Sequence, residues 1–173
     1  MLTSEKLTHT EGELFCLVDN LYGRAFPWHE QREVVAKQKA LAHASYALEA
    51  WFEGETFVGL SGCWTLGDKT YIEHLAIDDS LRGKGYGKRL LGQLLQRTSQ
   101  TLLEIDPLTT DIARQRLRFY QSMGFVANEF DHAHPSYHQG MADHELIVLS
   151  YPQALEEETY QQFNRDLRQV VMA

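Results

Sequence analysis

The residues best suited to chemistry in this sequence lie together in one glycine-rich loop. Three glycines alternate with cationic and aromatic residues over seven consecutive positions: Arg82, Gly83, Lys84, Gly85, Tyr86, Gly87 and Lys88. Where a helix begins, backbone N–H groups lack intrahelical partners and carry a partial positive charge. Glycines allow a phosphate to approach such a backbone closely because they have no Cβ atom. If a helix begins in this loop, all seven residues are candidates for binding a pyrophosphate.

The segments on either side of the loop meet that requirement. Residues 71–77 combine aromatic, β-branched and alternating polar positions, which is typical of a β-strand. Beyond the loop, four leucines recur at the spacing of one helix face: Leu90, Leu91, Leu94 and Leu95. The sequence therefore predicts a strand, a phosphate-binding loop and an amphipathic helix over residues 85–98.

The spacing of the glycines excludes two common nucleotide-binding motifs. A Walker loop requires Gly-Lys followed by Ser or Thr, whereas Lys88 is followed by Arg89. A dinucleotide-binding fingerprint requires G-x-G-x-x-G, whereas the glycines of this loop occupy every second position. The pattern that fits is Arg-x-x-Gly-x-Gly, beginning at Arg82.

The charge distribution independently indicates a compact anionic ligand. The whole chain is acidic, with 16 Lys and Arg against 24 Asp and Glu. Residues 82–118 reverse this balance, since eight cationic side chains are accompanied there by only Glu104, Asp106 and Asp111. A basic segment in an acidic chain favours a compact polyanion such as coenzyme A over a long nucleic acid, which requires a broad positive surface. Taken singly, each cation could equally belong to a solvated helix face.

Length and composition limit the class of protein. The chain of 173 residues suffices for one well-buried domain, which we expect to span residues 1–173. No apolar run is long enough to span a membrane, and no secretory signal is visible at the start. Cys16 and Cys63 are isolated in apolar surroundings, as expected of thiols in a reducing compartment. We therefore expect a cytoplasmic protein without a membrane partner.

The order of the predicted elements is that of a mixed α/β domain. Turn-forming residues at Gly54 and Gly67 separate three strand-like segments, which indicates an antiparallel meander, and Gly124 ends a helix as its C-terminal cap. Predicted helices cover 11–25, 29–43, 85–98 and 111–123, with a last one around 160–171, and predicted strands cover 46–52, 56–65, 71–77, 102–105, 125–130 and 145–150. No repeat or linker divides this α/β pattern.

A second motif follows the loop by about 35 residues. Residues 119–125 read Phe-Tyr-Gln-Ser-Met-Gly-Phe, in which the helical Tyr120 precedes a Gly-Phe strand entry. Together with Arg-x-x-Gly-x-Gly, it resembles the GNAT superfamily of acyl-CoA-dependent N-acetyltransferases over roughly residues 46–150. The resemblance implies a single domain with a central, mixed but mostly antiparallel sheet whose strands splay apart between flanking helices. It also implies acetyl-CoA as the cosubstrate and no metal ion.

Shorter segments resemble a bacterial subgroup of this superfamily that has no assigned substrate. They are residues 103–107, the arginine-rich helix and residues 134–137. The subgroup has Gln-Pro-Pro-Tyr where this chain has His-Pro-Ser-Tyr, so no acceptor can be transferred from the subgroup.

The resemblance makes Tyr120 the candidate general acid. A phenol near the sulfur can donate a proton to the coenzyme A thiolate as it leaves. The alternative is a core tyrosine whose hydroxyl reaches a backbone carbonyl, because a buried tyrosine needs some partner.

Glu73 is the candidate general base. In this superfamily the strand before the loop often carries the group that deprotonates the acceptor amine, directly or through water. Strand alternation places Glu73 on the face of Tyr71 and places His74 on the opposite face. A glutamate beside an apolar cleft would have a raised pKa, which suits a base. The alternatives are a solvated Glu73 and, for His74, a hydrogen-bonded core imidazole.

The resemblance also assigns a role to the backbone of the same strand. Strands of the family splay at this point, so the amides of Leu75, Ala76 and Ile77 are expected to pair with the pantetheine arm and to stabilise the oxyanion. 

Four histidines lie close together near the C-terminal end: His132, His134, His138 and His144. No H-x-x-x-H spacing or cysteine partner accompanies them, so we expect no metal site. We interpret residues 131–143 as a loop that lines the acceptor pocket.

Two functions are consistent with these features. The first is an N-acetyltransferase that moves an acetyl group from acetyl-CoA to a primary amine of a small molecule or a peptide by direct attack. The second is a non-catalytic module that binds acyl-CoA as a sensor or a scaffold. The presence of both Glu73 and Tyr120 favours the enzyme. A net charge of −8 disfavours nucleic acid as a partner and favours cationic acceptors. The sequence is compatible with either a monomer or a homodimer.

Overall fold

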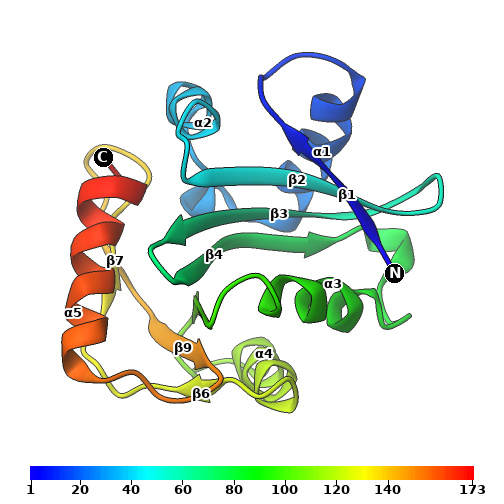
Figure 1. The fold of residues 1–173 in the computed structure, drawn as a ribbon. Coiled ribbons are helices and arrows are strands. Elements are labelled where there is room, and N and C mark those ends of the chain that lie inside the picture. The colour runs from blue at the N-terminus through cyan, green and yellow to red at the C-terminus, as the bar shows by residue number, and fades with distance from the viewer.

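A seven-stranded sheet runs through the computed structural model, which describes residues 1–173 (Figure 1). Its strands have the following bounds: β1 Thr3–Leu7, β2 Tyr46–Glu53, β3 Thr56–Leu66, β4 Lys69–Ile77, β5 Gln100–Ile105, β6 Val126–Ala127 and β9 Ile147–Tyr151. The strand order is β1-β2-β3-β4-β5-β9-β6, and β4 and β5 are the only parallel neighbours. The predicted mixed α/β fold with a mostly antiparallel sheet is confirmed.

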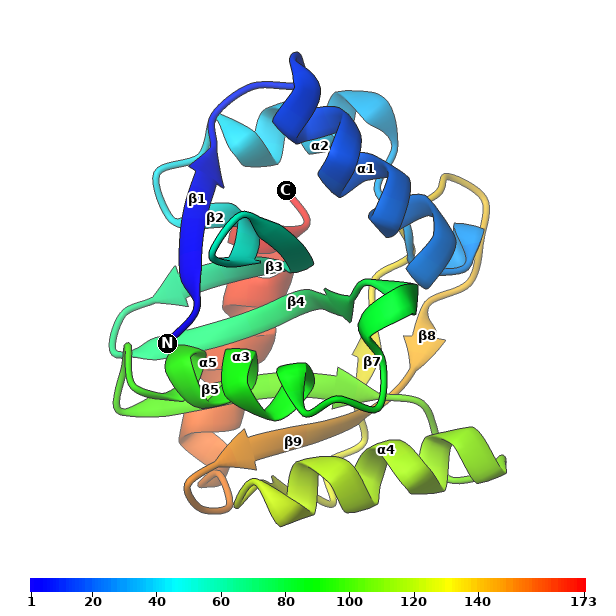
Figure 2. The same ribbon diagram turned by 90° about the vertical axis from the view of Figure 1, so that its right-hand side faces the viewer.

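Five α-helices flank the sheet (Figure 2). They are α1 Glu13–Ala25, α2 Val34–Leu41, α3 Tyr86–Leu95, α4 Asp111–Ser122 and α5 Glu157–Asp166, the last continued by a π-helical turn over Leu167–Val171. On one face, α1, α2 and α5 share a hydrophobic core with the sheet around Leu21, Trp64 and Phe163. On the other face, α3 and α4 share a second core around Leu91 and Phe125. None of the helices combines the length and apolar character needed to cross a membrane.

The sheet divides between β4 and β5. These strands pair over three residues only, from Lys69 opposite Gln100 to Tyr71 opposite Leu102. Beyond that point they diverge, and each strand keeps its other neighbour, β3 for β4 and β9 for β5 (Figure 2). The facing edges of residues 72–77 and 103–105 are therefore free of strand partners, as the predicted splay requires.

The helix predicted over residues 29–43 is divided in the structure. A 3₁₀ turn covers Trp28–Glu30, the chain is extended at Gln31 and Glu33, and α2 begins only at Val34. The extended segment directs Arg32 inward, where its guanidinium contacts Glu73, 41 positions away in the sequence. A long-range ion pair therefore overrides the local helical pattern.

The region after α4 also differs from its prediction. The strand predicted over 125–130 is limited to β6. Beyond it, the backbone N–H of Asn128 still donates to Val148 O at 2.9 Å, and its side-chain amide donates to Val148 O and Ser150 Oγ, each at 3.0 Å. A small hairpin forms around the segment predicted as a loop over residues 131–143: β7 Ala133–His134, inside that segment, pairs with β8 His144–Glu145, directly after it. The hairpin lies beside the open ends of β4 and β5 (Figure 2).

Candidate active site

A cleft of about 500 Å³ opens where β4 and β5 diverge. Its walls come from both strands, from α4, from the β7–β8 hairpin and from the C-terminal end of α1. The side chains that line it include four candidates for acid–base chemistry and two cations: Glu73, Glu104, His74, Tyr120, Arg82 and Arg116.

The glycine-rich loop has the backbone that a phosphate site requires. Gly83 and Gly85 have φ angles of +77° and +83°, which other residues rarely adopt. Gly85 is the N-cap of α3, and no side chain caps this helix end. Gly87 lies in the first turn, beside the ring of Phe119. The first N–H groups of α3 are therefore available to an anion.

The side chains of the loop divide into two groups. Tyr86 donates its hydroxyl to Glu53 at 2.8 Å, so it holds the start of α3 to the end of β2. Arg82, Lys84 and Lys88 are exposed, and Arg82 also lines the cleft. Three of the four predicted polar ligands in the loop thus extend into solvent, while Tyr86 makes a structural contact.

The predicted pantetheine-binding backbone borders the cleft. Leu75, Ala76 and Ile77 each pair with a residue of β3 and line the cleft on their other side. Because β5 has already diverged, the opposite edge of this segment is open to a ligand.

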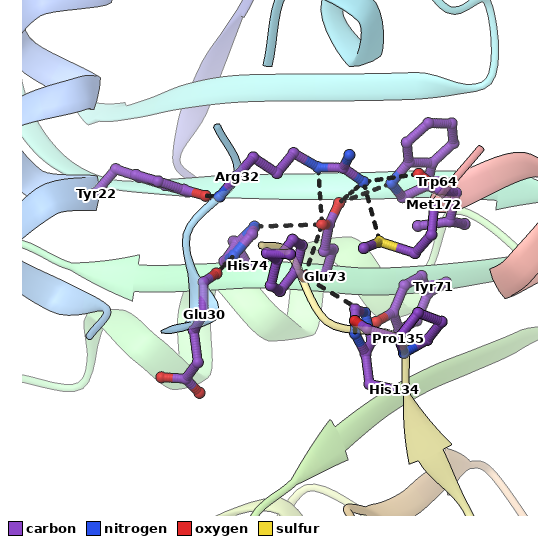
Figure 3. A network of polar contacts seen from close by, with 12 residues as sticks. Tyr22, Glu30, Arg32, Trp64, Tyr71, Glu73, His74, His134, Pro135 and Met172 are labelled. Carbon is purple, nitrogen blue, oxygen red and sulfur yellow. Dashed lines mark hydrogen bonds and ion pairs between the residues drawn. The ribbon is translucent and has the colours of Figure 1, made fainter. Parts of the chain in front are cut away.

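Glu73 is the centre of a buried polar network (Figure 3). Its carboxylate accepts four hydrogen bonds: from Arg32 Nε at 2.9 Å, Arg32 Nη2 at 3.1 Å, Trp64 Nε1 at 2.8 Å and the Tyr137 hydroxyl at 2.8 Å. These four donors occupy the lone-pair sites of both oxygens. Burial opposes the negative charge, but Arg32, His74 and Trp64 outweigh it and lower the pKa of Glu73 to about 2.

This geometry argues against Glu73 as the direct proton acceptor. The sequence-based prediction assumed an apolar cleft that raises the pKa of the carboxyl. The structure instead pairs Glu73 with Arg32, a residue that no local pattern linked to it. A carboxylate with a pKa of about 2 and no free lone pair is a weak base. Glu73 acts as a buried anion that orients Arg32 and Tyr137 beside the cleft.

The prediction that His74 points away from Glu73 is wrong. The ladder between β3 and β4 pairs Gly62 with His74 and Cys63 with Ile72, so Glu73 is the extra residue of a β-bulge. A bulge shifts the alternation of side chains by one position. Glu73 and His74 therefore both line the cleft.

His74 itself is held by a backbone group. Its Nε2 donates to the carbonyl oxygen of Glu30 at 2.8 Å, and its ring packs edge-on against Tyr22 and Phe26. The Nδ1 atom is buried, without a hydrogen-bond partner, and 3.9 Å from Glu73.

Tyr120 lines the cleft from α4. Its ring packs against Phe119 and Phe125, with centroids 5.2 and 5.5 Å apart. Burial raises the pKa of Tyr120, more than nearby Arg116 lowers it. No hydrogen bond to a protein group contributes to that pKa, so the hydroxyl is available to a ligand.

A second buried carboxylate lies on β5, and the sequence analysis gave it no role. Glu104 accepts hydrogen bonds from the Tyr71 hydroxyl and from His132 Nε2, the latter at 2.5 Å. His132 Nδ1 in turn lies 2.7 Å from the Tyr160 hydroxyl. The local signal for this site is one charged residue inside the apolar strand 102–105.

The histidine-rich segment contributes to the cleft wall, as predicted for a lining loop. His134, Tyr137 and His144 all line the cleft. His138 lies further out, with its ring stacked on Trp28 at 3.5 Å. The histidines do not converge, and no group of three or more His, Cys, Asp or Glu side chains is arranged to hold a metal ion.

Comparison with known proteins identifies the family. A sequence model of the acetyltransferase (GNAT) family matches residues 16–125, which is more than half of the chain. The chain belongs to the GNAT family. Among curated proteins, none matches it in sequence.

Solved structures share the fold of this GNAT chain. A GNAT-family protein from Bacteroides thetaiotaomicron superposes with a TM-score of 0.90 at 24% identity, over 98% of this chain and 97% of that one. The ribosomal-protein-S18-alanine N-acetyltransferase from Escherichia coli gives 0.58 at 18% identity, over 91% and 97% of the two chains. An aminoglycoside 6′-N-acetyltransferase complexed with coenzyme A gives 0.62 at 16% identity, over 86% and 95%.

Part of the cleft lies beyond the family match. The β7–β8 hairpin and α5 follow residue 125, where the match of this GNAT chain ends. They supply Tyr137 and His134 to the cleft wall and Tyr160 to the network behind Glu104. The wall of the cleft on the side of the β7–β8 hairpin is therefore built by a segment that the family model does not describe.

Proposed function

We propose that this GNAT protein transfers an acetyl group from acetyl-CoA to a primary amine of a small molecule or a peptide. The observation that carries the proposal is the cleft between the diverging strands, with an open strand edge on one side and an uncapped helix N-terminus nearby. Proteins of similar fold include one named for an aminoglycoside and one named for an alanine of a ribosomal protein. Both small-molecule and protein acceptors are thus compatible with this fold.

The residues present fit acetyl-CoA. The backbone N–H groups at the start of α3 would bind the pyrophosphate, and Arg82, Lys84 and Lys88 would neutralise its charge and that of the 3′-phosphate. The open edge at residues 75–77 would pair with the amides of the pantetheine arm. This arrangement would hold the thioester between the two strands, within the cleft.

The chemistry that these residues support is direct attack. The amine nitrogen would bond to the thioester carbonyl carbon while the carbon–sulfur bond breaks. Backbone N–H groups on the free edge of β4 would stabilise the oxyanion, and Tyr120 would donate its phenolic proton to the leaving thiolate. The reaction yields an amide and a free thiol. A neutral amine loses one proton from its nitrogen in this reaction, and an acceptor that binds as an ammonium ion must lose another proton before it can attack.

The acceptor side of the cleft is acidic. Four carboxylates line the cleft, those of Glu30, Asp106, Glu73 and Glu104, against the guanidinium groups of Arg82 and Arg116, and Arg32 balances the charge of Glu73. The Glu30 carboxylate points away from the network around Glu73 (Figure 3). Burial and the nearby charge of Asp106 raise the pKa of Glu30. These charges favour a cationic acceptor, such as a polyamine, an aminoglycoside or a lysine side chain.

A thiol-release assay tests the proposed function. Purified protein would be mixed with acetyl-CoA and a panel of amines comprising a diamine, a polyamine, an aminoglycoside and a short peptide with a free N-terminus. We expect thiol release that depends on one class of amine, with the acetylated amine detected by mass spectrometry. Tight binding of acetyl-CoA without thiol release from any amine would instead establish the sensor or scaffold module.

A further inference from the structure

Two side chains of the β7–β8 hairpin face the cleft between β4 and β5. His134 ends β7 and is 2% exposed, and Tyr137 lies three residues further on, in the connection to β8. Both line the cleft. Tyr137 contacts Glu73, which lies two positions before Leu75 and the free strand edge that would hold the pantetheine arm. The two side chains therefore lie close to the proposed position of the thioester.

The hydroxyl proton of Tyr137 is committed to Glu73. The Tyr137 oxygen lies 2.8 Å from Glu73 Oε2 and 3.4 Å from His134 Nε2. Glu73 is ionised and can only accept, and a hydrogen bond to a charged acceptor is the stronger of the two. Burial and the charge of Glu73 also raise the pKa of Tyr137 well above its ordinary value, so the phenol keeps this proton. The lone pairs of the Tyr137 oxygen remain available to an external donor.

The Nε2 atom of His134 is also an acceptor. Nδ1 lies 2.6 Å from the Pro135 carbonyl oxygen, and a carbonyl oxygen can only accept, so Nδ1 carries the proton. In a neutral imidazole the other nitrogen then presents a lone pair. An imidazolium would instead donate from Nε2 to the Tyr137 oxygen. Charge-assisted bonds of that kind are about 2.7–2.9 Å long, and the separation of 3.4 Å is too long for one.

Tyr137 Oη and His134 Nε2 are therefore two acceptors without a donor. They lie 3.4 Å apart, and neither has a proton to give to the other. Buried polar atoms of native proteins are nearly always hydrogen-bonded, so this pair lacks a donor that a ligand can bring. A primary amine is such a donor, because it carries two N–H bonds on one small nitrogen.

Other polar atoms near the cleft fit this role less well. His74 Nδ1 and His144 Nε2 also lack hydrogen-bond partners, but neither atom is exposed to a ligand. Glu73 is closed to a further donor, because four hydrogen bonds fill its lone-pair sites.

From this geometry we propose that Tyr137 Oη and His134 Nε2 bind the acceptor nitrogen and make the protein selective for primary amines. The inference rests on the proposed acetyl transfer. Each of the two atoms accepts one N–H bond of the neutral amine, which leaves the nitrogen lone pair free to point at the thioester carbonyl carbon. Arg32 and Glu73 act through Tyr137 as positioning residues, because their ion pair fixes the carboxylate that holds its hydroxyl.

A secondary amine fits this site less well than a primary amine. It has one N–H bond, so one of the two acceptors stays unpaired, and its additional carbon lies where the second hydrogen would be. Leaving a buried acceptor unpaired should lower kcat/KM by about ten- to a hundredfold.

The test is the ratio of kcat/KM for a primary amine to kcat/KM for its N-methyl analogue. The probes are the panel amine with the highest kcat/KM and its analogue with one methyl group on each primary nitrogen. For a linear diamine this is the N,N′-dimethyl diamine, and for a peptide it is the N-methyl peptide. We expect a ratio of at least about tenfold for the wild type. A wild-type ratio near one would overturn the inference.

Variants show whether the two atoms cause this selectivity. Tyr137→Phe keeps the ring beside Arg32 and removes the oxygen, and His134→Leu removes Nε2. In both variants the ratio should fall below about threefold, because the one acceptor that remains is satisfied by either amine. His134→Gln places an amide oxygen near the position of Nε2 and should keep most of the ratio.

A matched control separates amine binding from a structural role. Tyr22→Phe also removes a hydroxyl that contacts Arg32, since Tyr22 Oη accepts from the Arg32 backbone N–H at 2.8 Å, but Tyr22 does not line the cleft. A disturbance of the network lowers kcat/KM for both amines alike. Tyr22→Phe should therefore keep the wild-type ratio.

Two further outcomes would overturn the inference. One is a folded Tyr137→Phe or His134→Leu variant that keeps the wild-type ratio. The other is a ¹⁵N NMR spectrum that shows His134 as an imidazolium at about pH 8, because Nε2 would then have no lone pair; we expect the neutral form with its proton on Nδ1. In each case the wild type still transfers acetyl groups, so the proposed function stands. Wild-type protein that binds acetyl-CoA without releasing thiol to any amine would overturn both.

Discussion

At the scale of single residues, the Tyr120 hydroxyl can be tested by removing one atom. Tyr120→Phe keeps the ring contacts with Phe119 and Phe125. Acetyl-CoA affinity should persist, while kcat should fall roughly 10²-fold because the thiolate leaves without its proton donor. Higher pH should not restore turnover, since the variant removes the proton donor to the thiolate and does not change the protonation of the acceptor amine. Normal turnover in this variant would show that Tyr120 is only a core residue.

The ion pair between Arg32 and Glu73 gives a second prediction at this scale. Arg32→Met leaves a buried carboxylate without its main counter-charge, which should destabilise the fold by about 3–5 kcal/mol in urea unfolding. The double variant with Glu73→Gln should recover part of that loss, because no charge is then left unpaired. Strictly additive losses in this cycle would contradict the pairing.

The two sides of the site differ in how far the sequence could predict them. Tyr120 and the glycine-rich loop were predictable because each belongs to a short contiguous motif. The surroundings of Glu73 were not, since Arg32 and Tyr137 lie 41 and 64 positions away from it in the sequence. The burial and pairing of a carboxylate depend on such distant partners, so its pKa direction was predicted with the wrong sign.

At the scale of elements, the start of α3 tests the phosphate site. Gly85→Asp places a negative charge beside the first N–H groups of the helix and should weaken acetyl-CoA binding by at least about tenfold, or 1.4 kcal/mol. Gly85→Asn is the matched control, because Asn has the same size without the charge and also tolerates a positive φ. Calorimetry showing equal affinities for the two folded variants would contradict a phosphate site here.

Elements with strong local signals were predicted well. Positive-φ glycines at Gly54 and Gly67 mark the two turns of the β2–β3–β4 meander, as their positions in the sequence indicated. The bulge at Glu73 and the β7–β8 hairpin were not predictable. The bulge depends on a shift of register between two strands, and the hairpin pairs only two residues per strand. Neither leaves a periodic pattern in the sequence.

At the scale of the whole molecule, stability should depend on pH through buried ionised groups. The pKa of Glu73 is about 2 in the folded protein against an ordinary value of 4.5. A lowered folded pKa contributes stability above the unfolded value, and this contribution is lost as the pH falls from about 4.5 towards about 2. Thermal unfolding of Glu73→Gln should therefore show a shallower acid decline than the wild type. An equally steep decline would place the acid sensitivity elsewhere.

The opposite pH response is expected at the contact between the β7–β8 hairpin and the N-terminal half of the chain. His138 lies between two acceptors, since Nδ1 contacts the Glu33 carboxylate and Nε2 lies 2.8 Å from the Trp28 carbonyl oxygen. Only the imidazolium form can donate to both. The Trp28 carbonyl and Glu33 raise the pKa of His138 above its ordinary value of 6.5.

The contacts of His138 with Glu33 and Trp28 should therefore weaken as the pH rises. A raised folded pKa contributes stability that is fully present below pH 6.5 and is lost as the pH passes the folded pKa. The difference in Tm between wild type and His138→Gln should be largest in mildly acidic buffer and should shrink towards alkaline pH. His9→Gln, at an exposed position outside the hairpin, should show no such trend. Because Tyr137 precedes His138 and donates to Glu73, hydrogen exchange in the hairpin should rise over the same pH range. A Tm difference that is constant with pH would show that His138 contributes through packing on Trp28 alone.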